Sequence, residues 1–174
     1  MAPITLPEPC LVVLLGAAGV GKSTFAARHF APDEVLSSDA FRERVAGDAG
    51  DQAATGRAFA ALHRALAARL GLGLTTVVDA TNVQSHARRR LLRLAGVGGV
   101  PAVAIVLDLP VDVVLARNAG RERVVPEDAV RRQLADLRRS LRPGGLPAEG
   151  FLRVVHLTSP HEVDELVVVR RRLE

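Results

Sequence analysis

Short apolar stretches alternate with longer stretches of helical periodicity along the whole chain. Several of the apolar stretches are continuous, which is typical of strands buried on both faces of a sheet. Strands are predicted at residues 11–15, 34–37, 75–79, 102–108 and 153–157. Helices are predicted at residues 22–30, 52–70, 85–95, 111–118 and 126–141, with a last one from residue 160 to about residue 169. This alternation predicts an α/β fold with a parallel five-stranded sheet flanked by helices.

The segment Gly-Ala-Ala-Gly-Val-Gly-Lys-Ser at residues 16–23 joins the first predicted strand to the first predicted helix. It has the spacing of a nucleotide-binding P-loop, in which glycines let backbone N–H groups turn toward phosphates at a helix N-terminus. Lys22 would bridge the β- and γ-phosphates of ATP or another nucleoside triphosphate, and Ser23 would ligate Mg²⁺. The predicted nucleotide-binding residues are Gly16, Ala17, Ala18, Gly19, Val20, Gly21, Lys22, Ser23 and Thr24. A Gly-rich turn with an exposed lysine is the alternative interpretation.

Composition favours one compact domain over residues 1–174, because the chain is 48% hydrophobic and 24% charged. Its apolar runs are shorter than the roughly 20 residues that a membrane helix needs, and residues 1–9 lack the pattern of a signal peptide. A cytoplasmic location is therefore expected. The lone Cys10 cannot form an internal disulfide, and it is expected to be a small packed residue.

Lys22 is the only lysine among the 23 basic residues, so a compact ammonium remains at the position where the phosphate motif requires it. The arginines elsewhere suit solvated helix faces, and they are also compatible with a polyanionic substrate such as nucleic acid. The five histidines show no paired metal-ligand spacing and are expected to be structural or surface residues.

Ligands of parallel α/β sheets bind at the carboxyl ends of the strands, so polar residues that follow the predicted strands are candidates for chemistry. After the second strand, Ser38 can cap a short helix that places Asp39 and Arg42 on one face. Asp39 can accept the proton of an attacking hydroxyl, and Arg42 can hold a phosphate of the acceptor. A local capping and ion-pair role is the equally weighted alternative.

Asp79 ends the third predicted strand and is followed by Ala80, Thr81 and Asn82. An aspartate in this position can reach Mg²⁺ through water or orient a catalytic arginine. The alternative is an aspartate that starts a loop. Thr81 and Asn82 can equally form a turn or contact the substrate.

Three arginines surround Gly120 ahead of the helix that Pro126 initiates, and this pattern is typical of a lid over ATP. They are Arg117, Arg121 and Arg123. The later arginine pairs at residues 131–132 and 138–139 recur at helical spacing, where a solvated face is the preferred interpretation. The same ambiguity applies to residues 88–90.

These motifs together resemble the N-terminal kinase domain of the bacterial polynucleotide kinase-phosphatases of RNA repair, which are P-loop 5′-hydroxyl polynucleotide kinases. The matching segments lie at residues 21–26, 34–39, 51–55, 77–84, 103–110 and 130–133. The resemblance covers nearly the whole chain and implies the P-loop kinase fold, with an arginine-bearing lid at about residues 117–142. The phosphatase and ligase portions of such enzymes are absent from the sequence, so they are expected as partner domains or proteins of a repair system.

The resemblance implies that the γ-phosphate of ATP passes to the 5′-hydroxyl end of RNA or DNA. Asp39 would be the general base, Arg42 would hold the acceptor phosphate, and Arg123 would be the lid arginine on the ATP phosphates. Arg117 and Arg121 would support the nucleotide. Gln52 would shape the acceptor site, and Asp79 would orient the side of the site on which Arg42 lies. The alternatives are a P-loop kinase of a small-molecule hydroxyl acceptor and an ATP-binding module without catalysis.

Overall fold

The computed structural model describes residues 3–45 and 52–172, and it places the backbone but not the side chains of residues 52–54. The strands are β1 (Ile4–Glu8), β2 (Leu11–Leu15), β3 (Val35–Ser37), β4 (Thr76–Asp79), β5 (Ala102–Leu107), β6 (Arg153–Leu157) and β7 (Val168–Arg172). The helices are α1 (Lys22–His29), α2 (Ser38–Val45), α3 (Gln52–Gly71), α4 (Ser85–Val97), α5 (Val111–Ala119), α6 (Glu127–Ser140) and α7 (Pro160–Glu165). Short 3₁₀ turns span Pro32–Glu34 and Leu146–Ala148.

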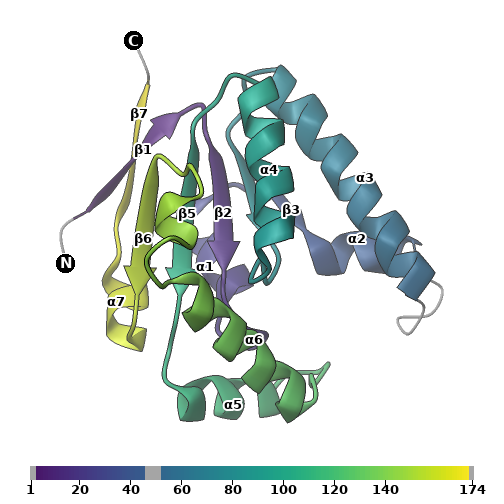
Figure 1. The fold of residues 1–174 in the computed structure, drawn as a ribbon, viewed down its shortest axis with the longest axis vertical. Coiled ribbons are helices and arrows are strands. Elements are labelled where there is room, and N and C mark those ends of the chain that lie inside the picture. Colours follow the sequence, from purple (N-terminus) through teal and green to yellow (C-terminus); the bar gives the residue numbers. More distant parts are fainter. Residues whose placement is uncertain (1–2, 46–51, 173–174) are drawn as a thin grey trace.

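The predicted five-stranded sheet is present, with all pairings parallel and the strand order β3-β4-β2-β5-β6. Its register places Asp79 beside Leu14 and also beside Ser37. The ends of β3, β4 and β2 therefore lie at one level, and the segments that follow them share one edge of the sheet (Figure 1). That edge is where the sequence places its candidate chemistry.

Residues of β2 alternate between two apolar clusters, which explains why its sequence is continuously apolar. Val12 and Leu14 pack with Phe25 of α1 and Val163 of α7 on one face of the sheet. Leu11, Val13 and Leu15 belong to the cluster on the other face, with side chains of α3 and α4. The sheet is thus covered by helices on both faces, as Figure 1 shows.

The predicted helix from residue 160 to about residue 169 is wrong in its second half. Helix α7 ends at Glu165, and Val168–Arg172 forms strand β7. This strand pairs in parallel with β1, which the sequence pattern did not predict. A run of β-branched valines favours an extended backbone, and the distant partner strand supplies its hydrogen bonds.

Cys10 is fully buried, and burial raises the pKa of its thiol to about 12, in accord with a packed residue. Over the described residues, the helices are too short or too polar to cross a membrane.

Candidate active site

The loop from Gly16 to Gly21 adopts backbone conformations that only glycine tolerates at two decisive points. Gly19 has a φ of 85°, and a Cβ there would lie 2.9 Å from the Cβ of Asn118 on α5. A Cβ on Gly16 would lie 2.7 Å from a methyl group of Val20. The glycines therefore permit both the tight turn and the close approach of α5 to the loop.

Lys22 begins α1 and turns its side chain back into the loop. Its Nζ donates hydrogen bonds of 2.9 Å to the carbonyl oxygens of Gly16 and Ala17. The ammonium is buried, and burial lowers its pKa from 10.5 to about 8, although the nearby Asp79 carboxylate opposes the shift. Among the described residues, the hydrogen bonds of this buried cation go to neutral carbonyl oxygens, so it is well placed to attract a phosphate.

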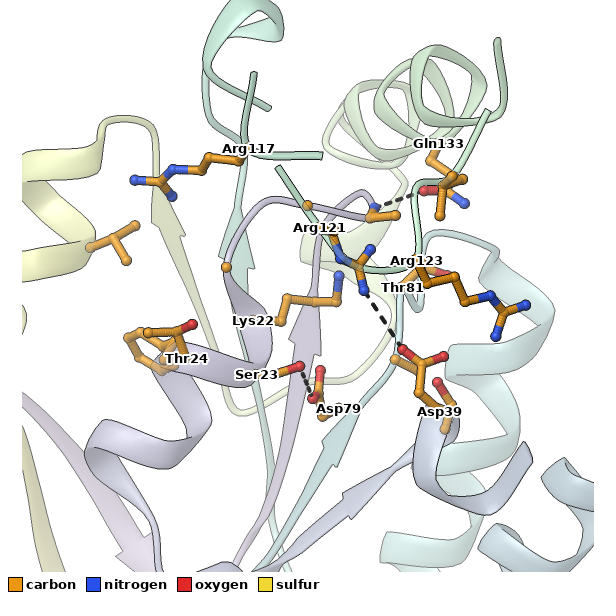
Figure 2. A pocket seen from close by; sticks show the side chains of 18 of the residues that line it. Lys22, Ser23, Thr24, Asp39, Asp79, Thr81, Arg117, Arg121, Arg123 and Gln133 are labelled. Atoms are coloured by element: carbon orange, nitrogen blue, oxygen red, sulfur yellow. Dashed lines mark hydrogen bonds and ion pairs between the residues drawn. The ribbon is translucent and has the colours of Figure 1, made fainter. Parts of the chain in front are cut away.

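Ser23 and Asp79 join the start of α1 to the end of β4. The Ser23 hydroxyl donates a 2.7 Å hydrogen bond to Oδ2 of Asp79 (Figure 2). Hydroxyl and carboxylate oxygens are donors that suit Mg²⁺, which usually keeps several waters and phosphate oxygens as its remaining ligands. No cluster of three or more His, Cys, Asp or Glu side chains suited to a metal occurs in the part of the chain that the structure describes. The donor set thus fits a metal carried in with a nucleotide.

Gln133 of α6 is a site residue that the sequence analysis gave no role. Its Oε1 accepts a 2.8 Å hydrogen bond from the backbone N–H of Ala18 (Figure 2). One phosphate-loop N–H is therefore bonded to a helix more than a hundred residues away. The only sequence signal for Gln133 is its place in the matching segment 130–133, because nothing local marks a solvent-edge glutamine as a loop partner.

Asp39 lies on α2 at the rim of the cleft, across from Lys22 in Figure 2. Its Oδ1 accepts a 2.8 Å hydrogen bond from Arg42, and its Oδ2 lies 4.0 Å from Nη2 of Arg121. The expected short helix is present, but its cap differs from the prediction. The Ser37 hydroxyl accepts the Ala40 N–H at 3.4 Å, while Ser38 is the first helical residue.

These residues surround one cleft of about 570 Å³. Its wall includes Lys22, Ser23, Thr24, Asp39, Arg42, Asp79, Thr81, Arg117, Arg121, Arg123 and Gln133. Arg117 also fastens α5 to the loop, because its Nη1 donates a 3.0 Å hydrogen bond to the carbonyl oxygen of Val20. The structure therefore brings the three predicted lid arginines to the same cleft as the phosphate loop.

Asn82, a predicted substrate contact, is not among the residues of this wall. Asn82 is buried with a φ of 50°, and its amide donates to the Leu14 carbonyl oxygen at 2.7 Å. It closes the turn after β4, so the turn-forming alternative for Asn82 agrees with the geometry. The side chain of Gln52 lies outside the described residues, although α3 begins at this position.

The arginines of the outer helices divide between surface and interior. Those at residues 131, 132, 138 and 139 are exposed, as the solvated-face interpretation predicts. Arg88 instead is fully buried. It donates to both carboxylate oxygens of Glu149 at 2.7 and 2.6 Å and to the carbonyl oxygens of Asn82 and Val83. Neither a solvated face nor a nucleic-acid contact applies to Arg88.

Comparison with known families adds to this geometry. A family described as the AAA domain matches residues 11–143, which include the phosphate loop, Asp39, Asp79 and the three predicted lid arginines. The chain belongs to the AAA domain family. A search of curated protein sequences finds no match.

Solved structures show which fold this chain shares. A chain of the Pnkp1/Rnl/Hen1 RNA repair complex superposes with a TM-score of 0.65 at 23% identity, covering 77% of this chain and 45% of that one. A putative kinase from Chloroflexus aurantiacus has a TM-score of 0.61 at 21% identity, with 87% and 85% covered. A gluconokinase from Sinorhizobium meliloti has a TM-score of 0.58 at 21% identity, with 93% and 89% covered.

These likenesses establish the P-loop kinase fold for this AAA-domain protein. The chain spans less than half the length of the repair-complex chain that it matches. The neighbours include a gluconokinase and a shikimate kinase, so kinases with different acceptors share this fold.

Proposed function

We propose that this protein is a polynucleotide 5′-hydroxyl kinase, which transfers the γ-phosphate of ATP to the 5′-hydroxyl end of RNA or DNA. The observation that carries the proposal is Asp39, with Arg42 at 2.8 Å and Arg121 at 4.0 Å, on the rim opposite the phosphate loop. A carboxylate can accept a hydroxyl proton, and a guanidinium group can grip a phosphate. A nucleic-acid 5′ end offers a hydroxyl and a phosphate close together.

In the proposed reaction, the 5′-oxygen attacks the γ-phosphorus while the bond from that phosphorus to the ADP oxygen breaks. The hydroxyl proton passes to Asp39. Lys22 and the arginines of the lid neutralise charge on the transferring group, so positioning and electrostatics carry most of the catalysis. Mg²⁺, with Ser23 as a ligand and Asp79 behind it, would supply further neutralisation of the phosphates.

The charge of the cleft supports an anionic donor together with an anionic acceptor. Among the described residues, six basic side chains line it, namely Lys22, Arg28, Arg42, Arg117, Arg121 and Arg123. Three acidic side chains of the described residues line it, namely Asp39, Asp79 and Asp164. This excess of positive charge attracts anionic groups, such as the phosphates of a nucleotide and of a nucleic acid, more strongly than it attracts a neutral group.

The proposal extends to the organisation of the protein. Residues 1–174 would form one P-loop kinase domain, with residues 117–142 as the lid, acting in the cytoplasm. Phosphatase and ligase domains or proteins of a repair system would be its partners, a proposal that rests on the likeness to a chain of an RNA repair complex.

A P-loop kinase of a small-molecule acceptor is the second candidate. It is favoured by the gluconokinase, which matches this chain along nearly the full length of both. The two candidates differ in the acceptor alone, since both use the phosphate loop in the same way.

The deciding experiment offers the protein γ-labelled ATP and Mg²⁺ with 5′-hydroxyl RNA, 5′-hydroxyl DNA, gluconate or shikimate as acceptor. We expect label on an oligonucleotide and none on the small acids. Label on a small acid without label on either oligonucleotide would refute the polynucleotide proposal in favour of the second candidate.

The role of Asp39 is tested by Asp39→Asn, which keeps the shape of the side chain. We expect kcat to fall by about 10²- to 10⁴-fold, which is the usual loss of a general base, while the affinity for ATP stays the same. Asp33→Asn is the matched control, because Asp33 is exposed on the turn before β3, outside the cleft. Full activity of Asp39→Asn would show that Asp39 is not the base.

A further inference from the structure

Two arginines of α2 each lie over a phenylalanine ring at the same distance, and one of these two contacts lies in the cleft. The Cζ of Arg42 lies 5.4 Å from the centre of the Phe59 ring on α3. The Cζ of Arg44 lies 5.4 Å from the centre of the Phe41 ring. Arg42 and Phe59 line the cleft, whereas Arg44 and Phe41 are not part of its wall.

The position of the Phe59 ring is set by the core beneath it. Leu62, on the next turn of α3, is buried in an apolar cluster, and Phe59 packs against this cluster while remaining half-buried. The ring is therefore held firmly from below and still reaches the cleft. It is a fixed surface on which a flexible side chain can rest.

Arg42 needs such a surface. Arg42 and Asp39 are three residues apart on α2, with side chains 29% and 55% exposed, and an exposed ion pair of this kind is worth little on its own. A guanidinium group over an aromatic ring gains about 0.5–1 kcal/mol at an exposed site and about 2 kcal/mol when desolvated. The ring contact thus adds to the Asp39 contact and restricts the rotamers of Arg42.

One donor of Arg42 is used by Asp39, and a guanidinium group has five. The ring holds the plane of the group without consuming any of the others. The N–H groups of Arg42 that no described residue binds remain in a fixed fork, the geometry that matches two oxygens of one phosphate.

We propose that Phe59 is a positioning residue for the acceptor: it holds the Arg42 guanidinium ready to bind a phosphate next to the reacting hydroxyl. The inference rests on the proposed function and deepens it, because it makes recognition of an acceptor phosphate depend on an aromatic side chain of α3. Phe59 acts through Arg42 and does not touch the reacting atoms.

The kinetic test compares Phe59→Leu, Phe59→Tyr and Phe41→Leu. In Phe59→Leu we expect KM for a 5′-hydroxyl oligonucleotide to rise about three- to thirty-fold, the equivalent of one cation–π contact, with KM for ATP unchanged and kcat at saturating acceptor nearly unchanged. Phe59→Tyr keeps the ring and should keep the wild-type KM. Phe41→Leu removes the matched contact outside the cleft and should leave the acceptor KM unchanged.

A double variant separates positioning from packing. Arg42→Met removes the group that Phe59 is proposed to hold, so adding Phe59→Leu to Arg42→Met should raise the acceptor KM no further. A further rise of the same size as in the wild-type background would overturn the proposal. An acceptor KM in Phe59→Leu within about two-fold of wild type would overturn it as well.

A second measurement does not require any acceptor. A ring current should shift the Nε–H signal of Arg42 upfield in ¹⁵N-resolved spectra of the wild type and of Phe59→Tyr, and the shift should vanish in Phe59→Leu. An unchanged Arg42 signal in a folded Phe59→Leu variant would overturn the proposal. If the wild type labels gluconate but no oligonucleotide, the proposed function fails, and this spectrum still tests the role of Phe59 independently.

Discussion

Arg121, in the segment between α5 and α6, lies 4.0 Å from Asp39 of α2, so one ion pair spans the mouth of the cleft. The Asp39 carboxylate thereby stands between two guanidinium groups that come from separate elements of the fold. Arg121 also approaches Lys22 closely enough to contribute to the lowering of its pKa. Arg121 thus lies near both Lys22 of the phosphate loop and Asp39 on the opposite rim of the cleft.

This relationship yields a prediction that separates the two candidate lid arginines. The family resemblance gives the role on the ATP phosphates to Arg123, whereas the geometry favours Arg121. We expect Arg121→Ala to lower kcat by about 10²- to 10³-fold, the usual loss of one preorganised charge contact, and Arg123→Ala to lower it less. Steady-state kinetics of the two variants measure the difference. A larger loss in Arg123→Ala would return the role to Arg123.

The buried ammonium of Lys22 makes nucleotide binding depend on pH. Because burial lowers its pKa to about 8, the side chain of the nucleotide-free protein loses its charge as the pH rises through that value. Only the charged form attracts the phosphates, so we expect the affinity for ATP to fall between about pH 7.5 and about pH 9.5. Calorimetric titration with ATP and Mg²⁺ at several pH values measures this. An affinity that stays constant over the range would contradict it.

Lys22→Met provides the control for this prediction, and comparison of its stability with that of the wild type checks the direction of the pKa shift of Lys22. Between pH values of about 8 and 10.5, the unfolded chain still holds a proton on Lys22 that the folded chain has released. The free energy of unfolding of the wild type should therefore rise relative to that of Lys22→Met across this window. In Lys22→Met, the affinity for ATP should be low and should not depend on pH in the same range.

Arg88 yields a prediction on stability. Its contacts join α4, the turn after β4, Glu149 and the Ser140 hydroxyl at the end of α6. Removing one partner of a buried ion pair leaves the other charge without compensation, which costs about 3–5 kcal/mol. We expect this loss in the unfolding free energy of Arg88→Met, measured by urea denaturation.

The neighbouring Arg89 offers a matched control, because it is exposed on the same helix. Arg89→Met should change the unfolding free energy by less than about 0.5 kcal/mol. The double variant Arg88→Met, Glu149→Leu should recover part of the loss, since neither charge is then buried alone. Equal stability of Arg88→Met and Arg89→Met would show that the buried pair contributes nothing.

The sequence was sufficient to place the central sheet, because its strands are buried on both faces and read as unbroken apolar runs. It also placed the phosphate loop, whose glycine spacing is a local requirement of the backbone. The cleft residues Asp39, Asp79 and Arg121 follow from the same logic, since each lies at the end of a strand, just after one, or just after the helix that follows one.

The rest depends on contacts between distant segments. Nothing in Arg88-Arg89-Arg90 tells which arginine points inward, because the distinction arises only when Glu149 and the turn after β4 surround one of them. Gln133 is a site residue only because α6 returns to the phosphate loop. Strand β1 contains Pro7, which weakens a strand prediction, and its ladder partner lies at the opposite end of the described chain.

That ladder has a consequence for how the chain folds. Ile4 pairs with Val168, so β1 and β7 can meet only after nearly the whole intervening chain has become compact. Contacts of such high sequence separation are costly in loop entropy and tend to form late. The β1–β7 pairing should therefore be the last cooperative step of folding and the first to open. Amide hydrogen exchange would show it as the fastest-exchanging strand pair, while the strands beneath the phosphate loop remain protected.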